Sequence, residues 1–203
     1  MAGQREAASL GMWVFIVTEI LFFGGLFATY SIYRSAYGHA FQAASHELHI
    51  WLGTINTAVL ISSSFTMALA VRAGQTGSRR TTIVCLILTL VLGSAFLGIK
   101  GVEYAREFAE HHVPGPHFEF DPKYAPQAQI FFSLYFVMTG LHAVHMIVGL
   151  GVLLVMLWMS VRGRFSPAYY TPLEISGLYW HFVDVVWIFL LPLLYLIGRH
   201  GAP

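Results

Sequence analysis

The chain has 203 residues, of which 57% are hydrophobic and only 10% are charged, and its formal net charge is +1 with neutral histidines. A soluble domain carries about a quarter charged residues, so this composition is typical of a chain that lies mostly in lipid. The small net charge gives no electrostatic basis for binding nucleic acid, and the single cysteine excludes an internal disulfide and a cysteine-based metal cluster.

Five apolar segments are long enough to cross about 30 Å of hydrocarbon as helices. Polar connections rich in Arg, His, Gly and Pro separate them, and no internal repeat is evident. We therefore predict an all-α integral membrane bundle of five transmembrane helices, which forms a single domain over residues 1–203. The predicted spans cover approximately residues 10–33, 50–71, 82–106, 130–159 and 177–198.

The orientation of the predicted bundle follows from the basic residues in its connections. The side that holds the N-terminus collects more arginine, whereas Glu and Asp dilute the basic residues on the other side. Because cytoplasmic loops carry an excess of Lys and Arg, we predict a cytoplasmic N-terminus and a C-terminus outside.

The first span contains an acid, Glu19, about nine residues from its start and hence about 13 Å deep. Its neighbours, among them Phe15, Ile16 and Leu21, are apolar. Ionisable groups are costly at this depth and usually have a partner or a task. Two interpretations remain open: a proton-responsive or partner-binding group, and a neutral acid hydrogen-bonded to a neighbouring helix.

The third span ends in charged residues, Lys100 and Glu103. Because a lysine can extend its ammonium group to the membrane surface, we expect a simple interfacial ion pair here. The loop that follows is rich in proline, which forbids a continuous helix. Its histidines, His111, His112 and His117, are expected in solvent.

The fourth span carries His142 and His145 on one helix face, which suggests a metal or haem site. Zinc or copper needs three or four convergent ligands, so His181 of the fifth span would have to meet them at the same depth. The alternative is hydrogen bonding between helices, which membrane proteins use for cohesion. The second interpretation is favoured because the spacing of two histidines is weak support for a metal.

The fifth span contains His181 and Asp184 one helical turn apart, with Trp180 and Trp187 on either side. A carboxylate beside an imidazole fixes the tautomer of the ring. We therefore expect His181 and Asp184 to satisfy each other and to hold helices together.

Taken together, these segments resemble subunit III of the haem–copper oxidases. The similarity covers nearly the whole chain, in family order, and is strongest in the last two motifs. The matching residues are 13–19 (WVFIVTE), 26–30 (LFATY), Glu103-Tyr104, 139–145 (TGLHAVH) and 179–187 (YWHFVDVVW). The longer family members have seven spans, and this chain is similar to the last five, as in short bacterial forms. The loop 111–121 has no family pattern.

The resemblance implies an accessory subunit of a respiratory complex that reduces oxygen to water and pumps protons. It implies no haem or copper in this chain, haem and copper in the catalytic subunit I beside it, bound phospholipid, and a place in the bacterial cytoplasmic membrane. It makes Glu19 the carbodiimide-reactive intramembrane acid of the family. We expect the remaining polar positions to serve packing, lipid contact or subunit contact: Glu103, His142, His145, Trp180, His181, Asp184 and Trp187.

Several alternatives stay open. Short relatives also occur in quinol oxidases and beside nitric oxide reductases, so the electron donor is not fixed by the resemblance. A small haem-b binding protein would use His142 or His145 with His181 as axial ligands. A proton-coupled transporter is disfavoured, because such folds are built from repeats that five spans cannot divide equally.

Overall fold

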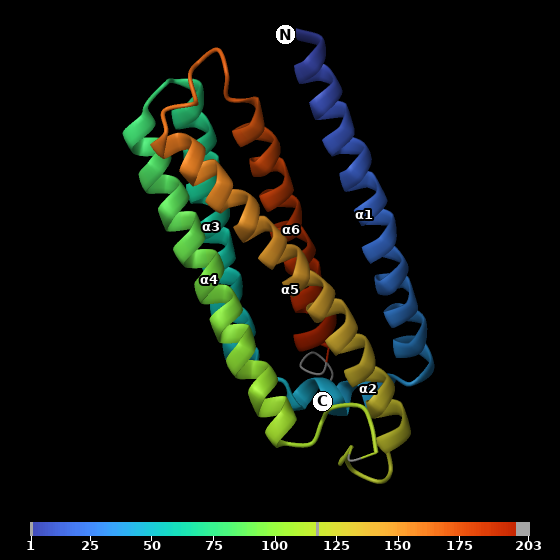
Figure 1. Ribbon diagram of the computed structural model, residues 1–203. Helices are drawn as coiled ribbons and strands as arrows, with labels where there is room; N and C mark the ends of the chain where they lie inside the picture. Colours follow the sequence, from blue (N-terminus) through green and yellow to red (C-terminus); the bar gives the residue numbers. More distant parts are fainter. Residues whose placement is uncertain (1, 117, 198–203) are drawn as a thin grey trace.

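The structure is a computed structural model that describes residues 2–116 and 118–197. Five of its helices are long and apolar enough to cross a membrane, and α2 is a short additional helix. The predicted all-α fold with five spans is therefore confirmed, and the chain is an integral membrane protein. The helices are α1 (Ala2–Ala36), α2 (Gly38–Glu47), α3 (Ile50–Gln75), α4 (Arg79–Ala109), α5 (Ala125–Val161) and α6 (Thr171–Tyr195) (Figure 1).

The helices differ from the predicted spans mainly at their ends. α5 begins at Ala125 and α6 at Thr171, each earlier than predicted. Each has a proline in its first turn, where the backbone N–H has no partner within the helix, so the proline does not interrupt it. The helix α2 was not predicted, since its ten residues are too short and too polar to resemble a span. The last predicted residue, 198, lies outside the described residues.

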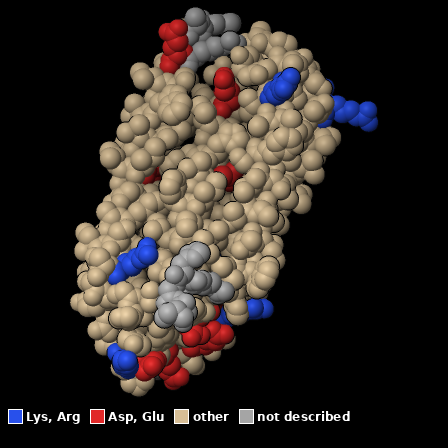
Figure 2. Space-filling view, turned by 180° about the vertical axis from the view of Figure 1, so that it is seen from behind, with Lys and Arg blue, Asp and Glu red and all other residues tan. Residues whose placement is uncertain are grey.

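Four of the long helices form a closed bundle in which α3, α4, α5 and α6 each contact two neighbours. The first helix stands beside this bundle: α1 contacts α5 and α6, approaches them near α2, and diverges from them toward the N-terminus (Figure 1). Charged side chains gather mainly toward the two ends of the molecule, and most of the middle is uncharged (Figure 2). That distribution is expected for a bundle surrounded by hydrocarbon.

The centre of the bundle is built around Trp180 of α6, which is fully buried. Its indole lies against Gly93 of α4 and Gly149 of α5. A Cβ atom at Gly93 would stand 2.7 Å from the indole, and one at Gly149 would stand 3.0 Å away. Small residues therefore allow the ring to lie between two helix backbones, as is common where membrane helices pack closely.

The C-terminal end of α6 is held by hydrogen bonds from other helices. The last carbonyls of a helix have no partner within it. Tyr30 of α1 donates its hydroxyl to the Leu193 carbonyl at 2.5 Å, and Ser45 of α2 donates to the Leu194 carbonyl at 2.7 Å. The short helix α2 thus links α1 to the end of the bundle.

Candidate functional site

The acid of the first span is paired with a histidine of the fourth. Glu19 of α1 lies 3.2 Å from Nε2 of His145 of α5, and the two side chains are about one-fifth exposed, at 20% and 18%. The His145 ring also meets Phe23 edge-on, with ring centroids 5.4 Å apart. This contact joins α1 to the bundle near the middle of the helix.

The contact of the other ring nitrogen, Nδ1, determines which tautomer the His145 ring adopts. Nδ1 lies 2.8 Å from the Leu141 carbonyl, which can only accept a hydrogen bond, so Nδ1 carries a hydrogen. One proton between the Glu19 carboxyl group and Nε2 of His145 can be held in two ways, by the carboxyl group or by Nε2. Both arrangements have no net charge, which makes the pair tolerable inside hydrocarbon. Adding or removing a proton would create a net charge there.

His142 does not share the surroundings of His145, although both lie on α5. Its ring is almost fully buried between Phe96 and Trp187, with ring centroids 5.5 and 5.3 Å away. Neither of its nitrogens makes a hydrogen bond to a described residue. His142 is therefore packed among aromatic rings, and the two histidines do not act as one unit.

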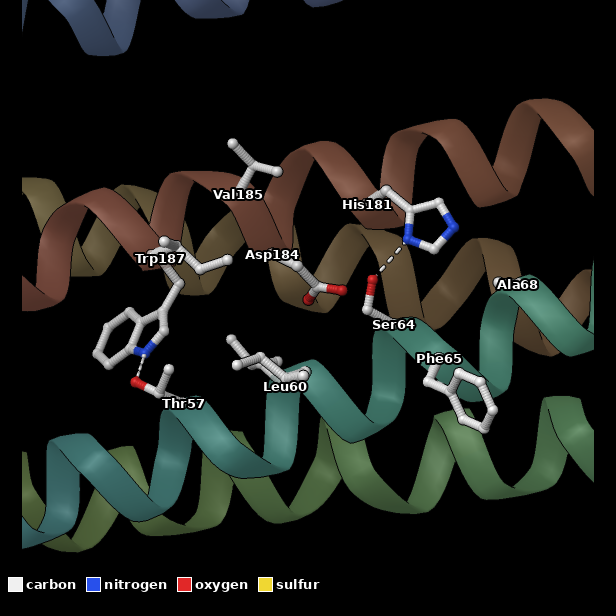
Figure 3. A pocket seen from close by; sticks show the side chains of 11 residues that line it. Thr57, Leu60, Ser64, Phe65, Ala68, His181, Asp184, Val185 and Trp187 are labelled. Carbon is white, nitrogen blue, oxygen red and sulfur yellow. Dashed lines mark hydrogen bonds between the residues drawn. The ribbon is translucent and has the colours of Figure 1, made fainter.

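The expected contact between His181 and Asp184 does not form. His181 Nδ1 is instead 2.6 Å from the Ser64 hydroxyl of α3. Asp184 is only 4% exposed, and neither of its oxygens makes a hydrogen bond of normal geometry to a described residue, although Ser64 is its polar neighbour. One turn of helix brings the two side chains to the same side of α6, but both turn toward α3 rather than toward each other (Figure 3).

The two tryptophans that flank this motif bond to the same helix. Trp180 donates its indole N–H to the Ser63 hydroxyl and Trp187 donates to the Thr57 hydroxyl, each at 3.0 Å. These two hydrogen bonds join α6 to α3 along successive turns of the helices.

The ion pair of Lys100 and Glu103 exists, at 3.0 Å, but it is not interfacial: the side chains are only 3% and 0% exposed. The ammonium group also donates to the hydroxyls of Tyr135 of α5 and Tyr195 of α6, at 3.1 and 2.7 Å. Both tyrosines in turn donate to the Glu103 carboxylate. We call these four residues the Lys100 cluster. Nothing in the sequence around either tyrosine signalled this role.

A further group at the end of α4 was also missed. His112 was expected in solvent, but its ring stacks on Phe132 at 4.9 Å and its Nδ1 lies 3.0 Å from Glu107 and 3.6 Å from Glu110. Among the described residues, these three are the one group whose ligand atoms lie close enough to hold a metal ion, and Glu110 is exposed. His117, which was also expected in solvent, lies outside the described residues.

The intramembrane histidines thus have separate neighbours. His145 lies 3.2 Å from the Glu19 carboxyl group, His181 bonds to Ser64, and His142 packs against aromatic rings. If two of these histidines bound a metal or haem, they would have to leave their present neighbours. Axial ligands must face each other across the haem, and these rings face different partners. The arrangement is suited to joining helices.

The comparisons with known proteins agree with this architecture. Residues 3–199 match the family model described as cytochrome c oxidase subunit III. The chain is 34% identical over 205 residues to cytochrome c oxidase subunit 3 of Corynebacterium diphtheriae, and the alignment covers 97% of this chain and 94% of that protein. It is 33% identical over 191 residues to the subunit 3 of Thermostichus vulcanus (94% and 87% covered). Quinol oxidase subunit 3 of Bacillus subtilis is 32% identical over 193 residues (95% and 88%).

Proposed function

The chain belongs to the cytochrome c oxidase subunit III family, and from this premise we propose that it serves a terminal oxidase that takes its electrons from cytochrome c. In this proposal it is the accessory, non-redox subunit, bound to the catalytic subunit I in the bacterial cytoplasmic membrane. Its N-terminus faces the cytoplasm. Haem and copper reside in subunit I, and this chain stabilises that subunit and supports its proton uptake.

The observation that carries the proton-uptake role is the Glu19–His145 pair. The pair joins the middle of α1 to α5, brings a carboxyl oxygen to 3.2 Å from an imidazole nitrogen, and retains partial exposure. Intramembrane carboxyl groups and histidines are typical members of proton relays. The pair is therefore suited to support proton supply to a neighbouring subunit.

Lipid binding is supported by the space between α1 and α6. A pocket of about 420 Å³ lies there near the start of both helices, and its lining includes Trp13 and Leu178 as well as the acids Glu6 and Glu174. Apolar walls with polar groups at one end suit a phospholipid that lies between the helices with its headgroup at the membrane surface. We propose that this pocket contributes to lipid contact.

The first test is purification of the tagged chain in mild detergent, with optical spectra of the complex and of the dissociated subunit. We expect a larger co-purifying subunit that contains haem and copper, while this chain is colourless. A Soret band that stays with this chain would contradict the proposal and would favour the haem-b alternative, with the histidines as ligands.

The second test concerns Glu19 in the assembled oxidase. We expect Glu19→Gln to leave assembly intact, while activity decays over fewer turnovers and proton uptake slows, because the carboxyl group of the pair is lost. The exposed acid of α2 provides the control, Glu47→Gln, which should behave as wild type. Normal pumping and normal durability of Glu19→Gln would leave Glu19 as a structural acid only.

The relatives include quinol oxidase subunits as well as cytochrome c oxidase subunits, so a quinol oxidase is the second candidate. Oxygen consumption by the purified complex with reduced cytochrome c or with a quinol separates the two. Activity with the quinol alone would replace the cytochrome c assignment and leave the accessory role unchanged.

A further inference from the structure

The end of α4 brings two carboxyl groups to one imidazole nitrogen. Nδ1 of His112 lies 3.0 Å from Oε2 of Glu107 and 3.6 Å from Oε2 of Glu110. We call these three residues the His112 cluster. Their side chains are exposed to different degrees, at 1% for Glu107, 11% for His112 and 47% for Glu110. The cluster therefore reaches from the interior of the protein to its surface.

The backbone and the aromatic neighbours of His112 hold its ring in this place. His111 has a positive φ of 55°, and the amide of His112 donates to the Glu107 carbonyl at 3.0 Å, so the chain turns back over the last turn of α4. The imidazole stacks on Phe132, with ring centroids 4.9 Å apart, and meets Phe120 edge-on at 6.0 Å. Nδ1 is thus directed at the two carboxyl groups by packing that involves other residues.

Hydrogen bonds within the His112 cluster do not satisfy it. Nδ1 carries at most one hydrogen, so its N–H can be directed at only one of the two carboxyl groups. Glu107 is almost fully buried, and its second oxygen, Oε1, has no hydrogen-bond partner among the described residues. With two ionised carboxylates, a protonated imidazole leaves one negative charge uncompensated beside a buried group, which is costly. A divalent cation with a neutral imidazole compensates both carboxylates.

The spacing of the three ligand atoms matches a tetrahedral metal site. With bonds of about 2.0–2.1 Å to the metal, two ligands of a tetrahedral zinc ion lie about 3.3 Å apart. The two distances from Nδ1 lie on either side of this value, and all three ligand atoms are within 4.8 Å of one another. An imidazole ligand suits zinc, whereas calcium and magnesium take oxygen ligands.

We propose that the His112 cluster binds one zinc ion through Glu107, Glu110 and His112, with water in the fourth position. The exposed Glu110 gives the ion access from solvent. The ion would attach the loop that follows α4 to the last turn of that helix. The inference goes beyond the accessory role in an oxidase, because the metal binds to this chain alone.

Zinc uptake by the purified protein is the first test. The chain is isolated through a tag without histidine, together with any subunits that accompany it, stripped with a chelator and dialysed against zinc chloride. We expect elemental analysis to find one zinc ion per chain, retained in an excess of calcium or magnesium chloride. Absence of bound zinc would overturn the proposal, and so would displacement by calcium, which would indicate a site without an imidazole ligand.

Substitutions locate the bound ion. We expect His112→Gln and Glu110→Gln each to weaken zinc binding by at least about tenfold, because even the loss of a group beside a ligand costs about 10–100-fold. His111→Asn is the matched control: it removes the neighbouring exposed histidine, and asparagine tolerates a positive φ. It should bind zinc as the wild type does. Wild-type affinity in His112→Gln, or lost affinity in His111→Asn, would overturn the proposal.

Thermal unfolding shows whether these variants fold. Glu110 is exposed, so Glu110→Gln should unfold at the wild-type temperature when zinc is absent. A ligand that binds only the folded state raises the unfolding temperature. Zinc should therefore raise it for the wild type and for His111→Asn, but not for Glu110→Gln at the same zinc concentration. An equal rise in all three would place the zinc elsewhere and overturn the proposal.

X-ray absorption at the zinc edge identifies the ligands. We expect nitrogen and oxygen neighbours at about 2.0–2.2 Å, with the signature of a single imidazole. Two or more imidazoles would assign the zinc to other histidines and overturn the proposal. These measurements also separate the inference from the proposed function. Co-purification of a haem-containing subunit decides the proposed function, and zinc binding by the chain, with or without that subunit, decides the His112 cluster.

Discussion

The Lys100 cluster and the pocket between α3 and α6 that Asp184 lines both place ionisable side chains inside the bundle, but only the cluster satisfies them fully. Lys100 has three acceptors for its three N–H groups, and Glu103 accepts from Lys100, Tyr135 and Tyr195. In the pocket, the Asp184 carboxyl group has the Ser64 hydroxyl beside it, and neither of its oxygens makes a hydrogen bond of normal geometry to a described residue.

The difference teaches how to interpret buried charge in a subunit of a larger complex. A buried network whose members satisfy each other belongs to the fold of the chain itself. A buried carboxyl group that has only a serine hydroxyl beside it, as Asp184 has Ser64, contributes less to the fold because it has fewer hydrogen bonds to lose. Removing one ionisable side chain should therefore lower the stability of the subunit strongly in the Lys100 cluster and only slightly in the pocket.

The largest loss of stability is expected from Lys100→Met. The substitution leaves the Glu103 carboxylate buried without its counter-charge, which typically costs about 3–5 kcal/mol. Unfolding of the purified subunit in detergent measures the loss. The double variant Lys100→Met/Glu103→Gln removes both charges and should recover a large part of it. If the single variant loses less than about 1 kcal/mol, the cluster does not hold the bundle together.

The contact of Trp180 with the helix backbones should be nearly as sensitive, and it tests how tightly α6 packs against α4. Gly93→Ala places a Cβ atom 2.7 Å from the indole, and overpacking of this kind costs about 1–3 kcal/mol. Gly98→Ala, on the same helix with no atom within 4 Å of the added Cβ, is the matched control and should cost nothing. Equal thermal stability of both variants would mean that α6 can shift freely against α4.

A smaller effect is expected from Tyr30→Phe, which removes the hydrogen bond to the Leu193 carbonyl at the end of α6. Interhelical hydrogen bonds in membranes contribute about 0.6 kcal/mol on average, and up to about 1.7 kcal/mol. Thermal unfolding of the subunit should show a loss within that range. Tyr33→Phe, a substitution at an exposed tyrosine of the same helix, is the control. A larger loss for Tyr33 than for Tyr30 would contradict the role of α1 in holding α6.

The smallest effect is expected from Asp184→Leu in the isolated subunit. Because the carboxyl group has no normal hydrogen bond to lose, the free energy of unfolding should change by less than about 1 kcal/mol or should rise. Comparison with Lys100→Met in the same detergent gives the contrast directly. A loss of several kcal/mol would place Asp184 with the Lys100 cluster as an internal structural group.

The sequence alone determined the membrane class, the five spans and the residues worth examining. Span length and hydropathy are local properties, so about 20 apolar residues indicate a transmembrane helix whatever surrounds them. The intramembrane acids Glu19 and Asp184 were identified for the same reason, since their cost depends on depth rather than on a particular partner. The motifs around them were also sufficient to indicate the family.

Only the tertiary structure decided which polar groups meet. The pairing of Glu19 with His145, the turn of His181 toward Ser64, and the burial of Lys100 between Tyr135 and Tyr195 depend on the rotation and depth of neighbouring helices. Every span is apolar on nearly all sides, so hydropathy does not show which face of a helix meets which neighbour. The short helix α2 escaped prediction for a related reason, because its contacts with α1, α5 and α6, rather than its own sequence, hold it in place.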